Sequence, residues 1–236
     1  MDDLFAPFAG RYDASLGALG EPAAIDPVLD VLQELAGDGR ALEFAIGTGR
    51  VALPLAARGV PVAGIDLSEP MVEELRRKPG GDAIPVTVGS MTSTRVDGPF
   101  RVVYLVFNTI GNLVTQELQV ECFANAAAHL EPGGAFVIEL EVPALRRLPP
   151  GERFVVFDAS ERHGGIDEYE PAAQRLVSHH YGPNGHSSMP FRYAWPAELD
   201  LMAQLAGMQL RERWADWDRS PFTGESTKHV SIWEKR

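Results

Sequence analysis

A strand-like run that passes directly into two glycines is the feature that most constrains the fold of this chain. Residues 42–53 read LEFAIGTGRVAL, an apolar segment, a turn containing Gly47 and Gly49, and then the start of a helical pattern. Glycine lacks a Cβ atom, so it lets the backbone turn tightly and lets a ligand approach closely. A strand, a glycine turn and a helix in this order are typical of the first crossover in a nucleotide-binding α/β sheet.

Strand-like and helical segments alternate along the first 142 residues. Apolar runs of strand length occur at 41–46, 60–67, 84–88, 101–107 and 135–142, and helical patterns at 24–35, 51–58, 69–78 and 115–130. We expect Asp26 to cap the first of these helices, with Pro27 at its first position, and Ser68 to cap the third. The alternation predicts an α/β fold with a Rossmann-like, mostly parallel sheet that has helices on both faces.

The pattern changes after residue 142. Residues 153–195 contain alternating segments, which predict an inserted antiparallel β segment added to the sheet or laid across its edge. A further helix begins at Pro196, and strand-like runs at 210–217 and 228–235 predict an antiparallel C-terminal strand pair. Because no repeat or linker divides the chain, we predict a single domain over residues 1–236. Its expected parts are an N-terminal lid and helix (1–40), a cofactor-binding core (41–142), the inserted β segment (143–195), and a C-terminal helix with antiparallel strands (196–236).

Composition narrows the partners of the protein. The chain has a formal net charge of -12, whereas a protein that binds nucleic acid needs clustered Lys and Arg. No apolar run reaches the ~20 residues that a membrane-spanning helix requires, and the N-terminus lacks the features of a signal peptide. The single cysteine, Cys122, excludes an internal disulfide framework and lies in a helix-like run where we expect a buried thiol. We therefore expect a cytoplasmic protein that binds neither nucleic acid nor membranes.

The residues around the glycine turn bear on which nucleotide it holds. Gly47, Gly49 and Ala52 satisfy the dinucleotide pattern G-x-G-x-x-G/A. Asp66 ends the next strand, where a carboxylate can accept both ribose hydroxyls. These features fit NAD and S-adenosylmethionine equally well. Glu43, four residues before Gly47, favours S-adenosylmethionine, because its carboxylate would repel a pyrophosphate and attract an ammonium or sulfonium group. The alternative is that Glu43 bonds only to amides of the loop.

Several motifs within residues 40–142 resemble those of the class I S-adenosylmethionine-dependent methyltransferases. The run Glu43-x-Ala45-x-Gly47-x-Gly49 is similar to their first motif, GIDLSEPM (64–71) to their second, and HLEPGGAFVIE (129–139) to their lead into strand five. VGSM (88–91) matches the segment after the third strand, although Ser90 stands where many members carry an aspartate. Ala45 likewise stands where many members have a glycine.

The resemblance implies a cofactor, a reaction and a set of binding residues. S-adenosyl-L-methionine is the expected cofactor and S-adenosyl-L-homocysteine its product, with the methyl group moving by in-line displacement to a small-molecule acceptor. The resemblance suggests a natural-product or amino-sugar intermediate as this acceptor. Asp66 is the expected ribose ligand, and Met71 is expected to lie against the adenine. The full set of expected cofactor-binding residues is Tyr12, Glu43, Ala45, Gly47, Gly49, Asp66, Leu67, Met71, Ser90, Met91 and Asn108.

The acceptor site is less well defined by the sequence. Asn108 and Thr109 follow the fourth strand at the edge where ligands collect in open α/β sheets. We expect Thr109 to bind the acceptor, and Asn108 either to act at the donor and acceptor or only to tie down the loop. Tyr12 lies in FAGRYDASLG, which resembles the lid helix of small-molecule methyltransferases. Its spacing from Phe5 and Phe8 also suits a helical face that packs on the core.

The inserted segment and the loop at 217–224 are expected to form a roof over the acceptor site. The acceptor-binding residues expected in this roof are Tyr181, Arg192, Tyr193 and Trp195. His179 or His180 is a candidate base for an amine or hydroxyl acceptor. Adjacent strand residues face opposite sides, so the two histidines cannot jointly hold a metal ion, and the reaction needs none.

Three functional interpretations stay open on the sequence alone. A methyltransferase accounts for the ordered motifs, and an NAD-dependent oxidoreductase accounts for the glycine pattern together with Asp66. A non-catalytic S-adenosylmethionine-binding module accounts for the lack of a convincing base. The sequence leaves open the identity of the acceptor, whether nitrogen, oxygen or carbon is methylated, and the oligomeric state.

Overall fold

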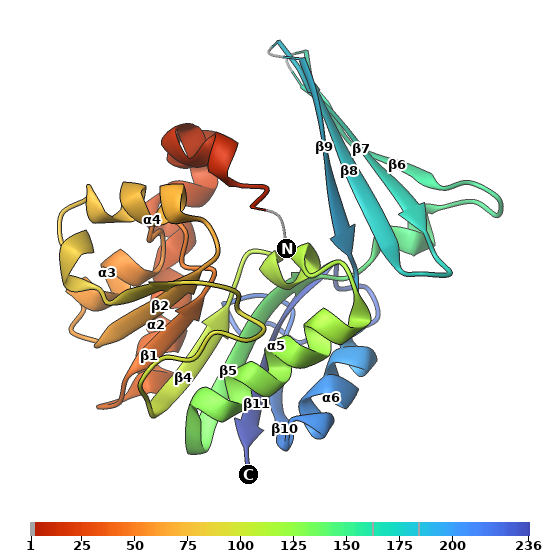
Figure 1. Cartoon of the computed structure of the whole chain (residues 1–236). Helices are drawn as coiled ribbons and strands as arrows, with labels where there is room; N and C mark the ends of the chain where they lie inside the picture. Colours follow the sequence, from red (N-terminus) through yellow and green to blue (C-terminus); the bar gives the residue numbers. More distant parts are fainter. Residues whose placement is uncertain (1–2, 162, 184) are drawn as a thin grey trace.

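The computed structural model describes residues 3–161, 163–183 and 185–236, and its largest feature is a seven-stranded sheet in the order β10-β11-β5-β4-β1-β2-β3 (Figure 1). The strands are β1 (Ala41–Phe44), β2 (Val62–Asp66), β3 (Val86–Val88), β4 (Phe100–Leu105), β5 (Leu130–Glu141), β10 (Met208–Trp214) and β11 (Lys228–Lys235). β1 to β5 pair in parallel, and β11 pairs antiparallel with both β5 and β10. The predicted mostly parallel sheet with an antiparallel C-terminal pair is confirmed.

Helices cover both faces of this sheet, as predicted. The helices and 3-10 turns are η1 (Ala6–Arg11), α1 (Tyr12–Ser15), η2 (Gly17–Gly20), α2 (Pro22–Ala36), α3 (Ala52–Ala57), α4 (Glu69–Arg76), η3 (Gly81–Ala83), η4 (Thr109–Asn112), α5 (Gln116–His129), η5 (Ala144–Arg147) and α6 (Pro196–Leu205). Buried residues of α2 and α3, such as Leu32 and Leu55, belong to one apolar cluster, and those of α5 and α6, such as Phe123 and Leu199, to another. None of the helices in the described part of the chain is long and apolar enough to cross a membrane.

The first long helix begins earlier than predicted. α2 starts at Pro22 with Glu21 in an extended N-cap conformation, so Asp26 and Pro27 lie inside the helix and not at its start. Pro22 supplies the fixed φ angle that suits a first helical position, which the apolar periodicity alone does not reveal. Pro27 lacks an N–H, so the helix is missing one backbone hydrogen bond at that point.

The inserted segment forms a sheet of its own. β6 (Phe154–Ala159), β7 (Gly164–Glu170), β8 (Arg175–Gly182) and β9 (Gly185–Arg192) pair antiparallel in that order and project away from the main sheet (Figure 1). The antiparallel character of the insert is confirmed, but the prediction that its strands join the main sheet or lie across its edge is wrong. β11 pairs with β5 on the side away from β4, and within the described part of the chain the inserted strands pair only with one another.

Candidate active site

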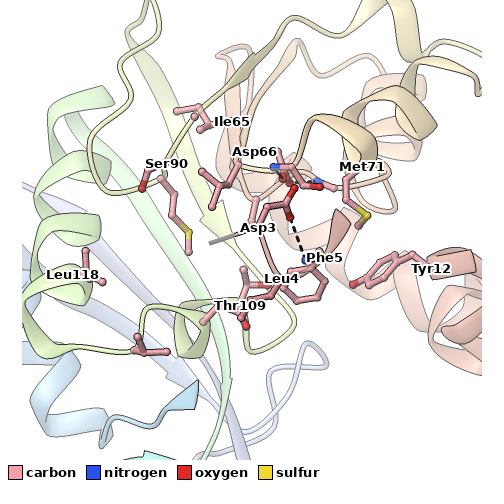
Figure 2. Close-up of a pocket in the computed structure, with 18 of the residues that line it drawn as sticks. Asp3, Leu4, Phe5, Tyr12, Ile65, Asp66, Met71, Ser90, Thr109 and Leu118 are labelled. Atoms are coloured by element: carbon pink, nitrogen blue, oxygen red, sulfur yellow. Dashed lines mark hydrogen bonds between the residues drawn. The ribbon is translucent and has the colours of Figure 1, made fainter. Parts of the chain in front are cut away.

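A cavity of about 450 Å³ lies where β1, β2 and β3 end (Figure 2). Its wall includes Ala45 and Gly47 after β1, Asp66 at the end of β2, and Ser90 after β3. Parallel strands direct their following loops to this edge, which is where ligands bind in open α/β sheets. A volume of this size suits a small-molecule ligand.

The Asp66 carboxylate organises the glycine turn. Asp66 Oδ2 accepts a hydrogen bond from the Gly47 N–H at 2.6 Å, and Asp66 Oδ1 accepts one from the Ser68 N–H at 2.8 Å. Burial raises the pKa of this carboxyl, and the bonds from Ser68 and Gly47 oppose that shift. Each carboxylate oxygen has a further lone-pair site, so Asp66 can also accept hydroxyl hydrogens from a ligand in the cavity that it lines.

Ser68 caps α4 differently from the prediction. It occupies the N-cap position, but its side chain makes no capping hydrogen bond, and its Oγ is buried without a partner among the described residues. The Asp66 carboxylate instead accepts a hydrogen bond from the Ser68 amide. Asp66 therefore has a structural role at the start of α4 in addition to its place on the cavity wall.

Ala45 adopts the left-handed backbone conformation that favours glycine. Its φ angle is 53°, and Gly47 and Gly49 in the same turn have φ angles of 55° and 80°. A side chain with a Cβ is strained in this region by roughly 1–2 kcal/mol. The replacement of a glycine by Ala45, noted above as a departure from the family pattern, therefore has a local energetic cost.

Glu43 lines a second, smaller cavity of about 40 Å³ that shares four wall residues with the first. The side chain is buried, and its Oε2 accepts a hydrogen bond from the Tyr104 hydroxyl at 2.9 Å. Burial raises the pKa of Glu43 to about 8, against the lowering effects of Tyr104 and Arg50. At neutral pH this pKa favours the protonated carboxyl, and a bound cation beside it favours the ionised form, so its charge depends on what the cavity holds.

The N-terminal segment forms one side of the larger cavity (Figure 2). Tyr12 lines both cavities, and its ring meets that of Phe5 edge to face with centroids 6.3 Å apart. Burial raises the pKa of Tyr12, so its hydroxyl keeps its proton at neutral pH. Asp3, Leu4 and Phe5 also line the cavity. None of the three was predicted to line the site: no motif marks Asp3 or Leu4, and the spacing of Phe5 indicated only a helical face that packs on the core.

Asn108 and Thr109 differ in placement although they are adjacent. Asn108 lies outside both cavities, and its Oδ1 accepts a hydrogen bond from the Glu141 N–H at 2.6 Å, which ties the loop to β5. This placement favours the loop-tying alternative over contact with the donor or a catalytic role. Thr109 lines both cavities, and its Oγ1 donates to the Val106 carbonyl at 2.7 Å.

His179 and His180 lie on β8, outside both cavities. His179 Nδ1 is 2.8 Å from Ser188 Oγ, and His180 Nδ1 is 3.0 Å from His163 Nε2. The two rings have separate partners, and their positions disagree with a role as base for an acceptor held in the cavity. Among the residues that the structure describes, no group of three or more His, Cys, Asp or Glu side chains is arranged to hold a metal ion.

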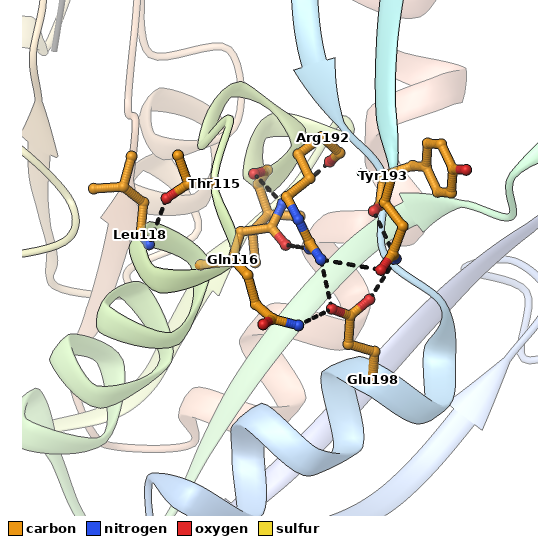
Figure 3. Close-up of polar contacts among 9 residues, drawn as sticks. Thr115, Gln116, Leu118, Arg192, Tyr193 and Glu198 are labelled. Atoms are coloured by element: carbon orange, nitrogen blue, oxygen red, sulfur yellow. Dashed lines mark hydrogen bonds and ion pairs between the residues drawn. The ribbon is translucent and has the colours of Figure 1, made fainter. Parts of the chain in front are cut away.

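Arg192 is buried in a polar network and does not line the cavity (Figure 3). Its guanidinium donates to Gln119 Oε1 and to Glu198 Oε1, both at 2.6 Å, and to Gln174 Oε1 at 3.2 Å. Gln119 belongs to α5 and Glu198 to α6. The network therefore attaches the end of β9 to the main body of the protein, which corrects the predicted role of Arg192 in acceptor binding.

The three aromatic residues predicted for the acceptor site, Tyr181, Tyr193 and Trp195, also lie outside the cavity. The rings of Tyr193 and Tyr169 pack with centroids 5.6 Å apart, Tyr181 stacks on a neighbouring histidine at 4.5 Å, and Trp195 takes the N-cap position of α6. Pro190 of β9 lines the cavity in their place. An edge-sheet aromatic packs on its neighbours more often than it binds a ligand, and composition alone does not separate the two roles.

Most of the predicted cofactor-binding residues do meet at the larger cavity. Those on its wall are Tyr12, Ala45, Gly47, Asp66, Leu67, Met71, Ser90 and Met91. Glu43 lines the smaller cavity, and Gly49 shapes the turn behind both. The two adjoining cavities thus combine oxygens that can accept hydrogen bonds from hydroxyl groups, two thioether side chains and a buried carboxyl. This combination fits a nucleoside that carries a cationic group.

Comparison with known proteins identifies the family. Residues 41–134 match the family described as methyltransferase domain. The chain is 35% identical to the CcbJ methyltransferase from Streptomyces caelestis, with 99% of this chain and 96% of that chain covered and a TM-score of 0.82. The cypemycin N-terminal methyltransferase from a Streptomyces species is 26% identical over 207 residues, which cover 84% of each protein.

A solved structure of CalS10 with S-adenosylmethionine bound shares the fold at lower identity. That protein is an amino pentose methyltransferase from Micromonospora echinaspora, 20% identical to this chain, with a TM-score of 0.68 over 95% of this chain and 96% of that chain.

The chain belongs to the class I S-adenosylmethionine-dependent methyltransferases. It is an enzyme that transfers a methyl group from S-adenosylmethionine. This confirms the predicted cofactor and reaction class and sets aside the alternative of an NAD-dependent oxidoreductase.

Proposed function

We propose that the enzyme methylates an amine nitrogen on a small natural-product or amino-sugar intermediate. The observation that carries this proposal is the chemistry of the cavity wall. Within the described part of the chain, its ionisable side chains are Asp3, Tyr12 and Asp66, without a histidine, lysine or cysteine. The two carboxylates accept hydrogen bonds from backbone amides, and Tyr12 keeps its proton at neutral pH.

An amine acceptor suits such a wall. A neutral amine attacks the sulfonium carbon with its own lone pair, so the N–C bond forms while the C–S bond breaks, and the surplus proton then leaves to water. An alcohol needs a base to remove its proton during the displacement. The acidic side chains also give the cavity a negative potential, which attracts amines and a cationic donor alike.

The proposal assigns parts of the donor to the residues that line the two cavities. Asp66 accepts hydrogen bonds from the ribose hydroxyls, Glu43 pairs with the ammonium group, and Met71 packs against the adenine. When bound, S-adenosylmethionine supplies an electrophilic methyl group on its sulfonium. Tyr12 and Thr109, which border both cavities, hold the acceptor beside that group and exclude water.

The names of the relatives support an amine acceptor. One relative is named as the cypemycin N-terminal methyltransferase, and CalS10 is described as an amino pentose methyltransferase involved in calicheamicin biosynthesis. Both names refer to nitrogen-containing acceptors. The cavity wall of this chain, which has no histidine, lysine or cysteine among the described residues, is consistent with the same kind of acceptor.

We further propose that the four parts of the chain act as one catalytic domain. Tyr12 comes from the N-terminal part, Asp66 from the core and Pro190 from the inserted segment, and all three line the same cavity. A single cooperative unfolding transition, seen together by circular dichroism and tryptophan fluorescence, is the expected result. Two separate transitions would contradict this proposal.

Methyl transfer with labelled donor tests the acceptor class. The purified protein is incubated with S-adenosylmethionine labelled on the methyl group and with pairs of sugars that differ only in an amino or a hydroxyl group at one position. We expect label to enter the amino member of at least one pair, with S-adenosylhomocysteine formed in equal amount. Transfer to hydroxyl members alone would refute the amine proposal. Donor binding without transfer to any acceptor would favour the non-catalytic module.

A further inference from the structure

The Asp13 carboxylate binds two parts of the protein that are distant in sequence. Asp13 Oδ1 accepts a hydrogen bond from the Thr48 hydroxyl at 2.6 Å, and Asp13 Oδ2 lies 2.5 Å from Lys78 Nζ. Lys78 Nζ also donates to the Thr48 carbonyl at 2.7 Å. Asp13, Thr48 and Lys78 thus form a closed triangle of charge-assisted contacts, which we name the Asp13 clamp.

The Asp13 clamp holds the glycine turn at a residue next to the one that Asp66 binds. Thr48 lies between Gly47 and Gly49 and is only 1% exposed. The N–H of Gly47 donates to Asp66, while the hydroxyl and the carbonyl of Thr48 bind Asp13 and Lys78. Two carboxylates therefore fix the turn on which the donor site is built.

The same clamp places the N-terminal segment against the cavity. Asp13 follows Tyr12, which lines both cavities, and the segment ahead of it contributes Asp3, Leu4 and Phe5 to the wall of the larger one. The pKa of Asp13 is lowered overall, because the bonds from Lys78 and Thr48 outweigh the raising effect of burial. The clamp is thus intact at neutral pH and joins the cavity wall to the glycine turn.

We propose that Asp13 is a positioning residue for the methyl donor: through Thr48 and Lys78 it keeps the N-terminal segment closed on the glycine turn and so retains the bound donor. The inference rests on the donor site proposed above. A protein that binds its ligand only with the segment attached has an apparent affinity that falls in proportion to the attached fraction. Loss of one half-exposed ion pair then corresponds to an apparent affinity that is weaker by up to about fivefold.

Binding of S-adenosylhomocysteine to four proteins tests this inference. Titration calorimetry and stopped-flow displacement give its dissociation constant and dissociation rate for the wild type, Asp13→Asn, Lys78→Met and the double variant. Asn at position 13 keeps the shape and the bond to Thr48 but loses the charge that attracts Lys78. We expect each single variant to bind several-fold more weakly and to release the ligand faster. The double variant should be little weaker than either single variant, because both remove the same interaction.

Trypsin cleavage after Arg11, followed by mass spectrometry with the ligand present, separates positioning from general destabilisation. Arg11 is exposed and lies in the segment just before Tyr12. Asp13→Asn should speed cleavage there and leave cleavage after Arg175, which is exposed on β8 and has no part in the clamp, unchanged. The matched control is Asp30→Asn, which breaks the pair between Asp30 Oδ1 and Arg58 Nη1 at 2.6 Å on α2 and should change neither binding nor cleavage.

Two results would overturn the inference. One is that Asp13→Asn binds S-adenosylhomocysteine with the same affinity as the wild type and releases it at the same rate. The other is weaker binding with equal acceleration of cleavage at both arginines, which would show a general loss of stability. If the wild type itself does not bind S-adenosylhomocysteine, the donor site proposed above fails first, and that outcome is distinguishable because all four proteins then behave alike.

Discussion

The buried carboxyl of Glu43 should make the protein less stable as the pH rises. In an unfolded chain this carboxyl titrates near its usual value of 4.5, whereas burial in the native protein raises its pKa to about 8. Between these values the folded state holds a proton that the unfolded state has lost, so folding stability is full below about pH 4.5 and declines as pH rises toward 8. At about 1.4 kcal/mol per pH unit, the decline between pH 6 and pH 8 is roughly 2 kcal/mol.

Replacing Glu43 by Gln should remove this decline. The amide keeps the size of the side chain and a carbonyl that can accept from the Tyr104 hydroxyl, which lies 2.9 Å from Glu43 Oε2. Urea unfolding of both proteins without donor at about pH 6, 7 and 8 gives the free energy of unfolding at each pH. All other titrating groups are common to both proteins, so the difference between the two pH profiles isolates Glu43. Profiles that stay parallel within about 0.5 kcal/mol would refute the reasoning.

The same titration should appear in donor binding. A bound ammonium or sulfonium group favours the ionised carboxylate, so donor binding at neutral pH should release up to one proton. The wild-type affinity for S-adenosylhomocysteine should therefore rise with pH and level off near pH 8, while Glu43→Gln should bind more weakly with little dependence on pH. Calorimetry in two buffers of different ionisation enthalpy measures the released protons. Identical heats in the two buffers would show that binding releases no proton, and this would contradict a pairing of Glu43 with the ammonium group of the donor.

Three further changes have expected outcomes. Asp66→Ala should weaken binding of S-adenosylhomocysteine by about 1–3 kcal/mol in calorimetry, since it removes two charge-assisted acceptors. An unchanged affinity would show that Asp66 does not bind the ribose. Ala45→Gly should stabilise the protein toward urea by up to about 1 kcal/mol, because glycine adopts the φ angle of 53° without strain, and a loss of stability would contradict that account. Arg192→Met should destabilise the protein by about 1–3 kcal/mol in urea, because it leaves the buried Gln119 Oε1 without its donor and the partly buried Glu198 without its cation. If Arg192→Met instead weakened acceptor binding with wild-type stability, Arg192 would belong to the acceptor site after all.

The sequence predicted well the parts of the site that follow from local order along the chain. A strand, a glycine turn and a carboxylate at the next strand end are fixed by short spacings, and Gly47 and Asp66 indeed meet at 2.6 Å between N–H and Oδ2. Met71 and Ser90 line the same cavity for the same reason. Parallel strands bring such positions to one edge whatever the details of packing.

The acceptor side could not be predicted in the same way, because it depends on contacts between distant segments. Arg192 looks like a recognition residue in its polar and aromatic surroundings, yet its partner Gln119 lies 73 positions away along the chain. The clamp that joins Asp13 to Thr48 spans 35 positions. No periodicity or motif reports such pairs, since their burial is decided only when helices and sheets pack together.

The structure also changes the physical basis for the choice of donor. From the sequence, Glu43 is expected to carry a fixed negative charge, whereas its pKa of about 8 favours the neutral form at pH 7 in the absence of a ligand. Ionising it at that pH costs only about 1.4 kcal/mol. A cation about 4 Å away gains roughly 4 kcal/mol at the effective dielectric constant typical of protein sites, so a sulfonium or ammonium group can ionise the carboxyl and keep a net gain. A pyrophosphate in the same place would push the pKa of Glu43 higher and gain nothing from it. If Glu43 faces the donor as proposed above, the selectivity arises because the bound cation itself favours the ionised carboxylate.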